Sequence, residues 1–335
     1  ANVVSGHSGS RQYDVRYEST PWPSPEQARW QPTALLAWFT CEGNINHFLG
    51  ETLYPLWQSV GTWLAKNKST KPPTVFVVAS SVVWPNPHDP DPACHSERFA
   101  YFFTLLWLRR TFYFAHPNGG AAAPYRVLDA PKRSTADAHR AMSSTPVCAY
   151  RPQQVQPFGG GSPPRSFYRS LAAASGICHA SASGEHARVV HILLLQRSTT
   201  RRLVNVAAAV RTLRALRGVS NVTVADFAGL DARDQMRLVC GYSMIVGVHG
   251  QGMEWGHFLH GAANDARAAL LEFKFPGWPC YYTSRMQATG MLVACQEQSR
   301  ANVHKVAKSD DVLLDVVGLA AAAQPLVDGV LKARW

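Results

Sequence analysis

The chain alternates short apolar runs with longer stretches in which apolar residues recur at helical spacing. Seven runs have the length and composition of buried strands: 34–39, 74–80, 125–129, 189–195, 221–227, 243–248 and 269–275. A helix over 46–66 is predicted by five apolar residues spaced three or four apart: Leu49, Leu53, Leu56, Val60 and Leu64. Pro55 within this stretch predicts a kink or a late helix start.

Further helices are expected between the strands. Residues 96–110 form one in the first half, and Val206, Val210, Leu213 and Leu216 mark one face of another. Asp231 is a plausible N-cap, with Asp234 in the first turn, for a helix through Cys240. Strands that are apolar on both faces and alternate with helices indicate a parallel sheet covered on each side.

The predicted fold class is therefore α/β, with two Rossmann-like domains whose parallel sheets face a cleft. Residues 1–32 are rich in Gly, Ser, Pro and Trp and are predicted to form an extended arm. An α/β domain follows over 33–185 and includes a Gly- and Pro-rich loop or linker at 151–188, where 156–165 is not expected to form regular structure. A second α/β domain over 186–335 ends in a helix.

Composition narrows the class of protein. A content of 46% apolar and 16% charged residues fits a folded chain, and the net charge of +11 favours an anionic ligand or a negatively charged surface. Lys and Arg are scattered, with no basic run interleaved with aromatic residues, which argues against nucleic-acid binding. The seven cysteines contain no CxxC pair, which argues against a zinc ribbon or redox motif, and their pairing stays open.

Other features suggest a lumenal compartment. The sequons that begin at Asn67 and Asn221 would accept N-glycans in the secretory pathway. No apolar run approaches the length needed to span a bilayer. Because the sequence begins at Ala, an upstream signal or membrane anchor is expected to have been removed or left out.

Polar residues and glycines follow or occupy three strands of the second half. They are Arg197, Arg201 and Asn205 after 189–195, His249, Gly250, Gln251 and Gly252 after 243–248, and Glu272 within 269–275. In open α/β sheets, ligands bind beyond the carboxyl ends of the strands. A helix from about Gly252 would offer unpaired amides to an anion, and the two arginines could contact phosphate oxygens. Glu272 would suit the hydroxyls of a ribose. Together these residues predict a nucleotide diphosphate site.

This order of motifs resembles the family-61 glycosyltransferases, which include plant xylan xylosyl- and arabinosyltransferases and the EGF-domain O-GlcNAc transferase. The resemblance is carried by R-x3-R-x3-N at Arg197, by "VGVHGQGM", by "LLEF", and by "GNINHFLGETLYPLW" with His47 and Glu51. It implies a GT-B fold, an inverting reaction, a UDP-sugar donor, a glycan or glycoprotein acceptor and a Golgi or endoplasmic reticulum location. Departures stand at Glu51, Gln251 and Glu254, where that family more often has Asp, a small residue and a polar residue such as Thr.

Inverting sugar transfer needs a base for the acceptor hydroxyl and positive charge on the departing diphosphate. His47 and Glu51 lie one helical turn apart and are candidate bases, and Glu254 is a third. Arg197, Arg201 and the Gly250–Gly252 amides would stabilise the diphosphate, so no metal ion or other cofactor is expected. His249 is assigned to donor contact or to the structure of the strand end.

Two alternatives stay open. A metalloenzyme could use Glu254, His257 and His260, which recur every three residues with His249 nearby, although the HExxH spacing is absent. The DxD in "HDPDP" (88–92) is a weaker metal signal in a Pro-rich loop. The second alternative is a catalytically inactive glycan-binding or scaffold protein of the same fold.

Overall fold

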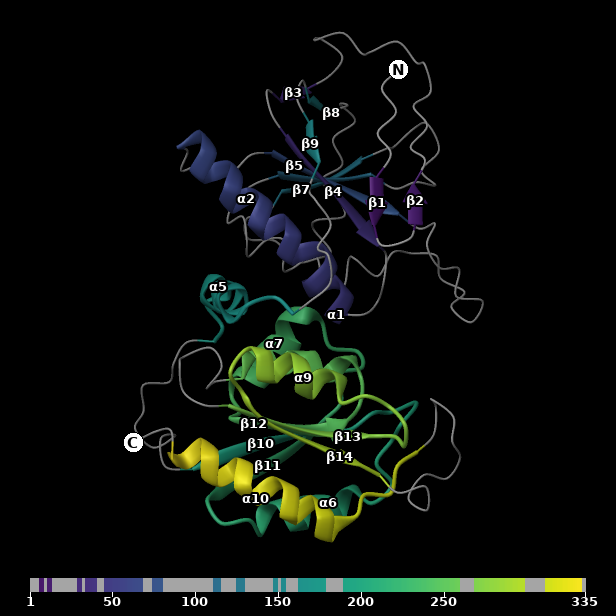
Figure 1. Ribbon diagram of the computed structural model, residues 1–335, viewed down its shortest axis with the longest axis vertical. Coiled ribbons are helices and arrows are strands. Elements are labelled where there is room, and N and C mark those ends of the chain that lie inside the picture. Colours follow the sequence, from purple (N-terminus) through teal and green to yellow (C-terminus); the bar gives the residue numbers. More distant parts are fainter. Residues whose placement is uncertain are drawn as a thin grey trace. The chain divides into compact units, whose positions relative to one another are not determined.

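A computed structural model describes residues 45–68, 162–178, 189–259, 268–298 and 311–332, without the side chains of 47, 51 and 52, together with the strands named below outside these ranges. The chain divides into two compact units, 1–161 and 162–335, each of which has its own sheet (Figure 1). The division falls within the Gly- and Pro-rich segment, and each unit is described by itself.

The second unit is built on a five-stranded parallel sheet. Its strands are β10 (Val190–Leu195), β11 (Val219–Ala225), β12 (Met244–Val248), β13 (Ala269–Lys274) and β14 (Leu292–Glu297), in the order β11-β10-β12-β13-β14. The four strands predicted in this half are confirmed to within a few residues. Strand β14 was not predicted, because this edge strand is half-buried and lacks a continuous apolar run.

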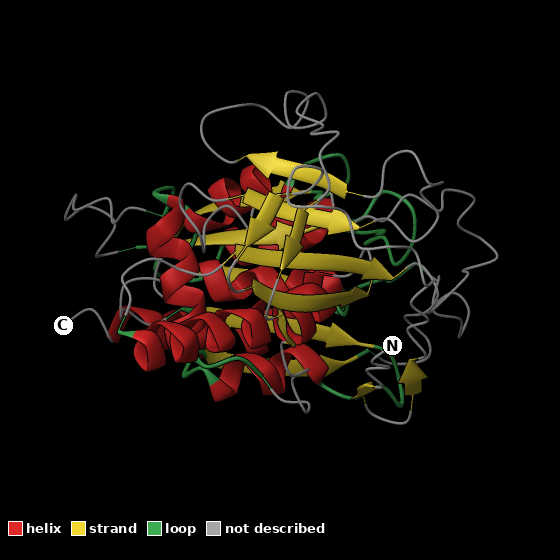
Figure 2. Cartoon of the chain, turned by 90° about the horizontal axis from the view of Figure 1, so that it is seen from above, coloured by secondary structure: helices red, strands yellow, loops and turns green. Residues whose placement is uncertain are grey.

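Helices cover both faces of this sheet. Helices α6 (Val206–Arg214) and α10 (Val316–Lys332) lie on one face, and α7 (Ala232–Cys240) and α9 (Tyr281–Ala288) lie on the other (Figure 1). The cartoon coloured by secondary structure shows helices gathered beside the strands (Figure 2). The three-layer α/β class predicted for this half, of the Rossmann-like type, is therefore observed.

Alternate residues of the strands enter two different cores. On the face of α6 and α10, Ile192, Leu194, Val246 and Leu271 join one apolar cluster with buried residues of both helices. Leu193, Ile245 and Leu270 are also fully buried but point to the opposite face, because successive strand side chains alternate. Burial on both faces explains why these strands appear in the sequence as continuous apolar runs.

Strand order places two loops at a ligand-binding position. In order along the chain, the strands occupy positions 2-1-3-4-5 of the sheet, so the direction of winding reverses between β10 and β12. Open α/β sheets bind ligands at such a switch point, beyond the carboxyl ends of the strands. The segments that start at Gln196 and His249 leave the sheet at this point.

The sheet of the first unit differs from the prediction in one respect. Its order is β7-β6-β5-β4-β9, formed by β4 (Ala34–Thr40), β5 (Thr74–Ser80), β6 (Thr111–Ala115), β7 (Tyr125–Asp129) and β9 (Pro152–Gln154). Pairing is parallel except between β6 and β7, which are antiparallel. The expectation of an all-parallel sheet is therefore wrong here. The link from 116 to 124 is shorter than the dozen or more residues that a parallel crossover requires.

Short strands also occur in the predicted arm. Within 1–32, β1 (Gly6–Ser8) and β2 (Arg11–Tyr13) pair antiparallel. The next strand, β3 (Arg29–Gln31), pairs in parallel with β8 (Val147–Ala149). The helix predicted at 96–110 lies outside the described residues.

The helix predicted over 46–66 is present but divided. It consists of α1 (Ile45–His47), a π-helical segment η1 (Phe48–Leu53) and α2 (Tyr54–Asn67). Pro55 lies in the first turn of α2 and has no amide hydrogen to give to the carbonyl of residue 51, so the α-helical ladder is interrupted there. The helix does not start late, since it begins at Ile45, but it changes from π-helical to α-helical geometry next to Pro55. Leu49, Leu53, Leu56 and Val60 form the buried face.

The segment 151–188 contains a helix that was not predicted. Helix α5 (Arg165–Ser175) begins directly after Pro164 and buries Phe167, Tyr168, Leu171 and Ala172. The expectation that 156–165 is irregular overlooked the amphipathic pattern that follows it. Since α5 contacts the 3₁₀ helix η3 (Gln251–Phe258), it belongs to the second unit.

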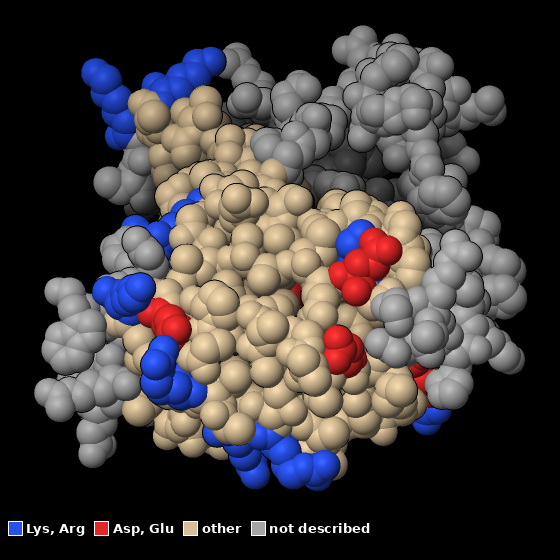
Figure 3. Space-filling view, turned by 60° about the horizontal axis from the view of Figure 1, so that its bottom comes forward, with Lys and Arg blue, Asp and Glu red and all other residues tan. Residues whose placement is uncertain are grey.

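Basic residues do not form one continuous field on the face shown in Figure 3. That face brings the bottom of Figure 1 forward, and uncharged residues cover most of its described surface. Ion pairs on the surface of the second unit include Arg202–Asp311 and Arg217–Asp328. Scattered, partly paired charge of this kind contrasts with the arginines described next.

Candidate anion site after strands β10 and β12

The loop after β10 is clamped from both ends. Gln196 and Leu203 exchange hydrogen bonds of 3.2 and 2.9 Å, and Asn205 makes two bonds of 2.9 Å to the backbone of Leu314. Arg202 pairs with Asp311 at the surface. These contacts hold the loop rigid and support the left-handed backbone of Arg201, whose φ is 57°. Both amide atoms of Asn205 are used in this way, which favours an anchoring role for it over donor contact.

Arg197 and Arg201 project from this loop and are half-buried. Arg201 donates from Nη1 to the backbone oxygen of His249, and Arg197 donates from Nη2 to Thr200 Oγ1 at 3.3 Å. Burial lowers the pKa of both groups. For Arg201, repulsion from Arg197 contributes next, and its pKa falls to about 10.

Neither guanidinium has a carboxylate partner among the residues that the structure describes. Within the described ranges neither forms an ion pair, and Arg201 Nε is buried without a hydrogen-bond partner. Asp226 opposes the fall in the pKa of Arg197 only through its charge. Two like charges that are partly removed from water and unpaired are costly unless an anion joins them. The pair is therefore suited to hold an anion.

Gly250 makes room for these guanidiniums. A Cβ atom built on Gly250 would lie 2.6 Å from Arg197 Nη1 and 3.4 Å from Arg201 Nη1. Its φ of 169° is extended backbone that any residue adopts, so glycine contributes space here and not a special backbone conformation. At Gly252 a Cβ would instead meet Leu195 and Phe227 at 3.3 Å. The helix expected from about Gly252 is present, but it is the 3₁₀ helix η3 and begins at Gln251.

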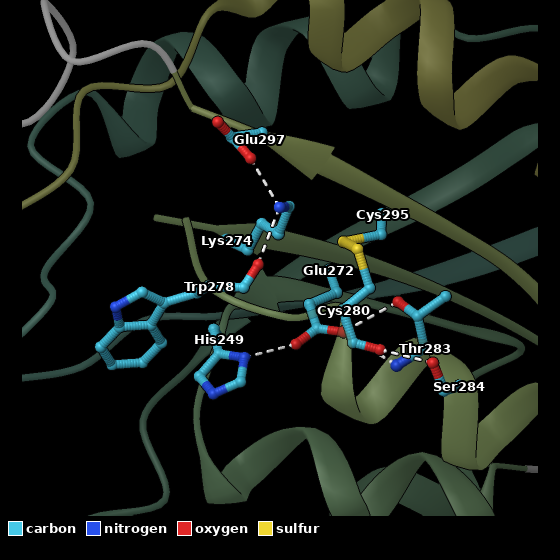
Figure 4. Close-up of a disulfide and its surroundings, with 9 residues drawn as sticks. All are labelled: His249, Glu272, Lys274, Trp278, Cys280, Thr283, Ser284, Cys295 and Glu297. Carbon is cyan, nitrogen blue, oxygen red and sulfur yellow. Dashed lines mark hydrogen bonds and ion pairs between the residues drawn. A yellow bond between two sulfur atoms is a disulfide. The ribbon is translucent and has the colours of Figure 1, made fainter. Parts of the chain in front are cut away.

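His249 and Glu272 form a hydrogen-bonded pair beside the arginines. Nδ1 of His249 lies 2.6 Å from Oε1 of Glu272 (Figure 4). Oε2 of Glu272 accepts two 2.8 Å bonds from Thr283, one from its backbone N–H and one from its hydroxyl. The Glu272 side chain is fully buried. Both of its oxygens are thus occupied by protein donors in this structure.

Two aromatic rings connect the imidazole with the arginines. The Trp278 ring lies 4.9 Å from the His249 ring and 5.8 Å from Arg201 Cζ. The Tyr282 ring lies 5.1 Å from the His249 ring. The three strand ends that the sequence singled out are therefore close together in space.

Glu254 belongs to a second cluster of side chains, which is buried. It accepts bonds from Arg285 Nε at 3.2 Å, Arg285 Nη2 at 3.0 Å and Tyr168 Oη at 3.0 Å. Its side chain is fully buried, and His257 Nε2 lies 3.6 Å away. The His257 ring stacks on Tyr168 at 3.7 Å. A carboxylate that is held in this way joins η3 to α5 and α9, which favours a structural role over proton transfer.

For several predicted site residues the structure describes the backbone alone or nothing. His47 ends α1 and Glu51 lies in the π-helical segment, but their side chains lie outside the described residues, as do His260 and 88–92. Both sequon asparagines are exposed: Asn67 ends α2, and Asn221 lies on the edge strand β11, with Nδ2 3.2 Å from Thr223 Oγ1. Among the described residues, no group of three or more His, Cys, Asp and Glu side chains has the arrangement of a metal site.

Two disulfides are present in the described part of the second unit. Cys178 pairs with Cys240, and Cys280, at the N-cap of α9, pairs with Cys295 of β14 (Figure 4). Sequence reasoning missed Trp278, Thr283 and Arg285. The aromatic cluster "WPCYY" directly after the strand at 269–275 was the available signal for the first of these.

A parallel α/β sheet covered by helices on both faces, with two arginines at its switch point, is typical of a Rossmann-like domain. The sequence model of the glycosyltransferase 61 family matches residues 45–261, which is more than half of the chain. The chain thus belongs to the glycosyltransferase 61 family, which indicates a glycosyltransferase. The resemblance noted in the sequence is confirmed. Comparison with curated proteins gives no significant match.

None of the helices in the described part of the chain is long and apolar enough to cross a membrane.

Proposed function

We propose that the protein is an inverting, metal-independent glycosyltransferase with a GT-B arrangement. It would transfer a pentose or GlcNAc from a UDP-sugar to a hydroxyl of a glycan or glycoprotein. Arg197 and Arg201 are the observation that carries this proposal, because they form an unpaired, half-buried cationic pair at the switch point of a parallel sheet. A leaving diphosphate needs such a partner for its developing negative charge.

The arginines would perform the role that a metal ion has in other transferases. Arg presents several donors in a fixed planar fork, which matches phosphate oxygens. Arg201 is already oriented by its bond to the His249 backbone, so less freedom is lost when the ligand binds. Proton transfer from the acceptor is assigned to the first unit, where His47 and Glu51 are the candidate bases.

A Golgi or endoplasmic reticulum lumen is the proposed location. Both described disulfides require an oxidising compartment, and the exposed Asn67 and Asn221 would be accessible to N-glycosylation.

The test is a panel of nucleotide sugars, scored for hydrolysis and transfer with and without EDTA. We expect turnover with at least one UDP-sugar, unchanged by the chelator. Loss of turnover on chelation that added Mg²⁺ or Mn²⁺ restores would contradict metal independence. Binding of UDP with no turnover of any donor would favour the inactive glycan-binding alternative. Activity only with nucleotides other than UDP would refute the donor assignment.

A further inference from the structure

We infer that His249 binds a ligand hydroxyl through Nε2 and that Glu272 is the positioning residue that prepares it for this task. The inference rests on the proposed function and deepens it. The sequence suggested Glu272 itself as the partner of a ribose diol, but its two oxygens are engaged by His249 and Thr283. The geometry points to the imidazole as the group that meets the hydroxyl.

The argument starts from the donor and acceptor inventory of the pair. A carboxylate only accepts hydrogen bonds, so the 2.6 Å contact places a hydrogen on Nδ1 of His249. In a neutral imidazole with hydrogen on Nδ1, Nε2 has a bare lone pair and is an acceptor. A hydroxyl can donate to this nitrogen, whereas an ionised phosphate oxygen cannot. In this neutral form His249 selects a hydroxyl over an anion.

Nε2 is available for such a contact. It makes no hydrogen bond to any residue that the structure describes, and it is not among the buried unpartnered atoms. The His249 side chain keeps 13% of its surface exposed, whereas that of Glu272 keeps none. Trp278 and Tyr282 pack around the ring on the side of the arginines. A ligand whose diphosphate meets Arg197 and Arg201 would thus bring adjacent hydroxyls to His249.

Glu272 is itself held by a rigid support. Thr283 binds it from the first turn of α9, and the Cys280–Cys295 disulfide ties the start of α9 to strand β14 (Figure 4). On the other side of the disulfide, Lys274 bonds the Trp278 carbonyl at 2.7 Å and pairs with Glu297. The segment between β13 and α9 is therefore fixed at both ends, which is what a group that orients another side chain requires.

The experiment measures equilibrium binding of four ligands: UDP, 2′-deoxy-UDP, 3′-deoxy-UDP and inorganic pyrophosphate. The key variant is His249→Asn, in which the Asn amide stands in for Nδ1–H toward Glu272 and only Nε2 is lost. We expect His249→Asn to weaken UDP about three- to tenfold, the value of one neutral hydrogen bond, and to leave pyrophosphate unchanged. The wild type should bind one of the deoxy ligands more weakly than UDP by the same factor. His249→Asn should bind that deoxy ligand and UDP with equal affinity.

A fifth ligand, a UDP-sugar, shows whether the hydroxyl belongs to the ribose or to the transferred sugar. If both deoxy ligands bind the wild type as UDP does, but His249→Asn weakens a UDP-sugar, the hydroxyl belongs to the transferred sugar. Equal weakening of UDP and pyrophosphate by His249→Asn would make His249 an anion ligand and overturn the inference. No effect on any of these ligands would also overturn it. Failure of the wild type to bind UDP at all would instead refute the proposed function.

The positioning role of Glu272 has its own readout. In protein labelled with ¹⁵N-histidine, the His249 signal should show hydrogen on Nδ1 and a bare Nε2, assigned by its loss in His249→Asn. Thr283→Val keeps the backbone N–H but removes the hydroxyl that binds Glu272. This variant should shift the tautomer balance of His249 and weaken the binding of UDP but not that of pyrophosphate. An unchanged tautomer in Thr283→Val and in Glu272→Gln would remove Glu272 from the proposal. Arg217→Gln, at an exposed pair, serves as the control.

Discussion

Arg201 donates a hydrogen bond from Nη1 to the backbone carbonyl oxygen of His249 and so joins the loop after β10 to the loop after β12. The two residues are 48 positions apart in sequence, and the parallel order of their strands brings them to one edge of the sheet. This contact aligns a cation with the glycine segment that begins at Gly250. The predictions below follow from this contact and from the buried cluster around Glu254.

Removal of either guanidinium should weaken nucleotide binding. Arg197→Ala and Arg201→Ala each delete charge-assisted contacts to the diphosphate, so we expect UDP affinity to fall about 10- to 100-fold. Titration calorimetry of UDP measures the change. Arg217→Gln removes an exposed arginine of the same unit and should leave the affinity unaltered. Wild-type affinity in both alanine variants would show that the anion binds elsewhere.

A methyl group at Gly250 should displace the arginines. Gly250→Ala places Cβ 2.6 Å from Arg197 Nη1, and the flexible guanidinium will move away instead of unfolding the protein. We expect about a tenfold loss of UDP affinity with a change in the free energy of unfolding below about 1 kcal/mol. Gly241→Ala is the matched control, because its Cβ meets only Leu238 O at 3.6 Å and its φ is −80°. Equal behaviour of the two variants would contradict the packing argument.

Glu254 should behave as a structural residue. Its fully buried carboxylate pairs with Arg285, and removal of one partner leaves an uncompensated charge, so Glu254→Ala should lower the free energy of unfolding by about 3–5 kcal/mol. Denaturant unfolding measures this loss. Asp234→Ala, at the exposed pair with Arg237, should cost less than about 1 kcal/mol. A stable Glu254→Gln variant with kcat reduced by orders of magnitude would instead restore Glu254 as the base.

Acid should destabilise the second unit through His257. Burial lowers the pKa of His257 from 6.5 to about 4, so the unfolded chain binds the proton first as the pH falls. Stability from this group is present above pH 6.5 and is lost between pH 6.5 and about 4, by up to about 3 kcal/mol. His257→Phe, which keeps a ring against Tyr168, should flatten this pH dependence of unfolding. Parallel pH curves for the variant and the wild type would contradict the assignment.

Sequence patterns predicted the sheet of the second unit because its strands are buried on both faces and stand out as apolar runs. The N-cap prediction for Asp231 is also confirmed, because its carboxylate accepts a hydrogen bond from the Asp234 backbone N–H at 2.8 Å. Strand β14 and helix α5 were missed because their half-buried or short patterns resemble loops. Strand β7 is antiparallel to β6 because the link between them is short. The apolar pattern of the sequence does not record the direction of a strand.

The proximity of the candidate site residues was predictable, but their hydrogen-bond partners were not. The topology of parallel strands suffices to bring Arg197, Gly250 and Glu272 to one edge. Whether Glu272 faces a ligand or a threonine depends on α9, and whether Glu254 is free depends on Arg285, which lies 31 residues further along the chain. Such pairings arise from tertiary packing, and no spacing in the sequence records them.

The most direct test of the central claim is a crystal structure of the protein with UDP bound. The diphosphate oxygens should lie within hydrogen-bonding distance of the Arg197 and Arg201 guanidiniums and beside the backbone of Gly250. Density for the diphosphate at any other place, with these two arginines still unpaired, would contradict the claim.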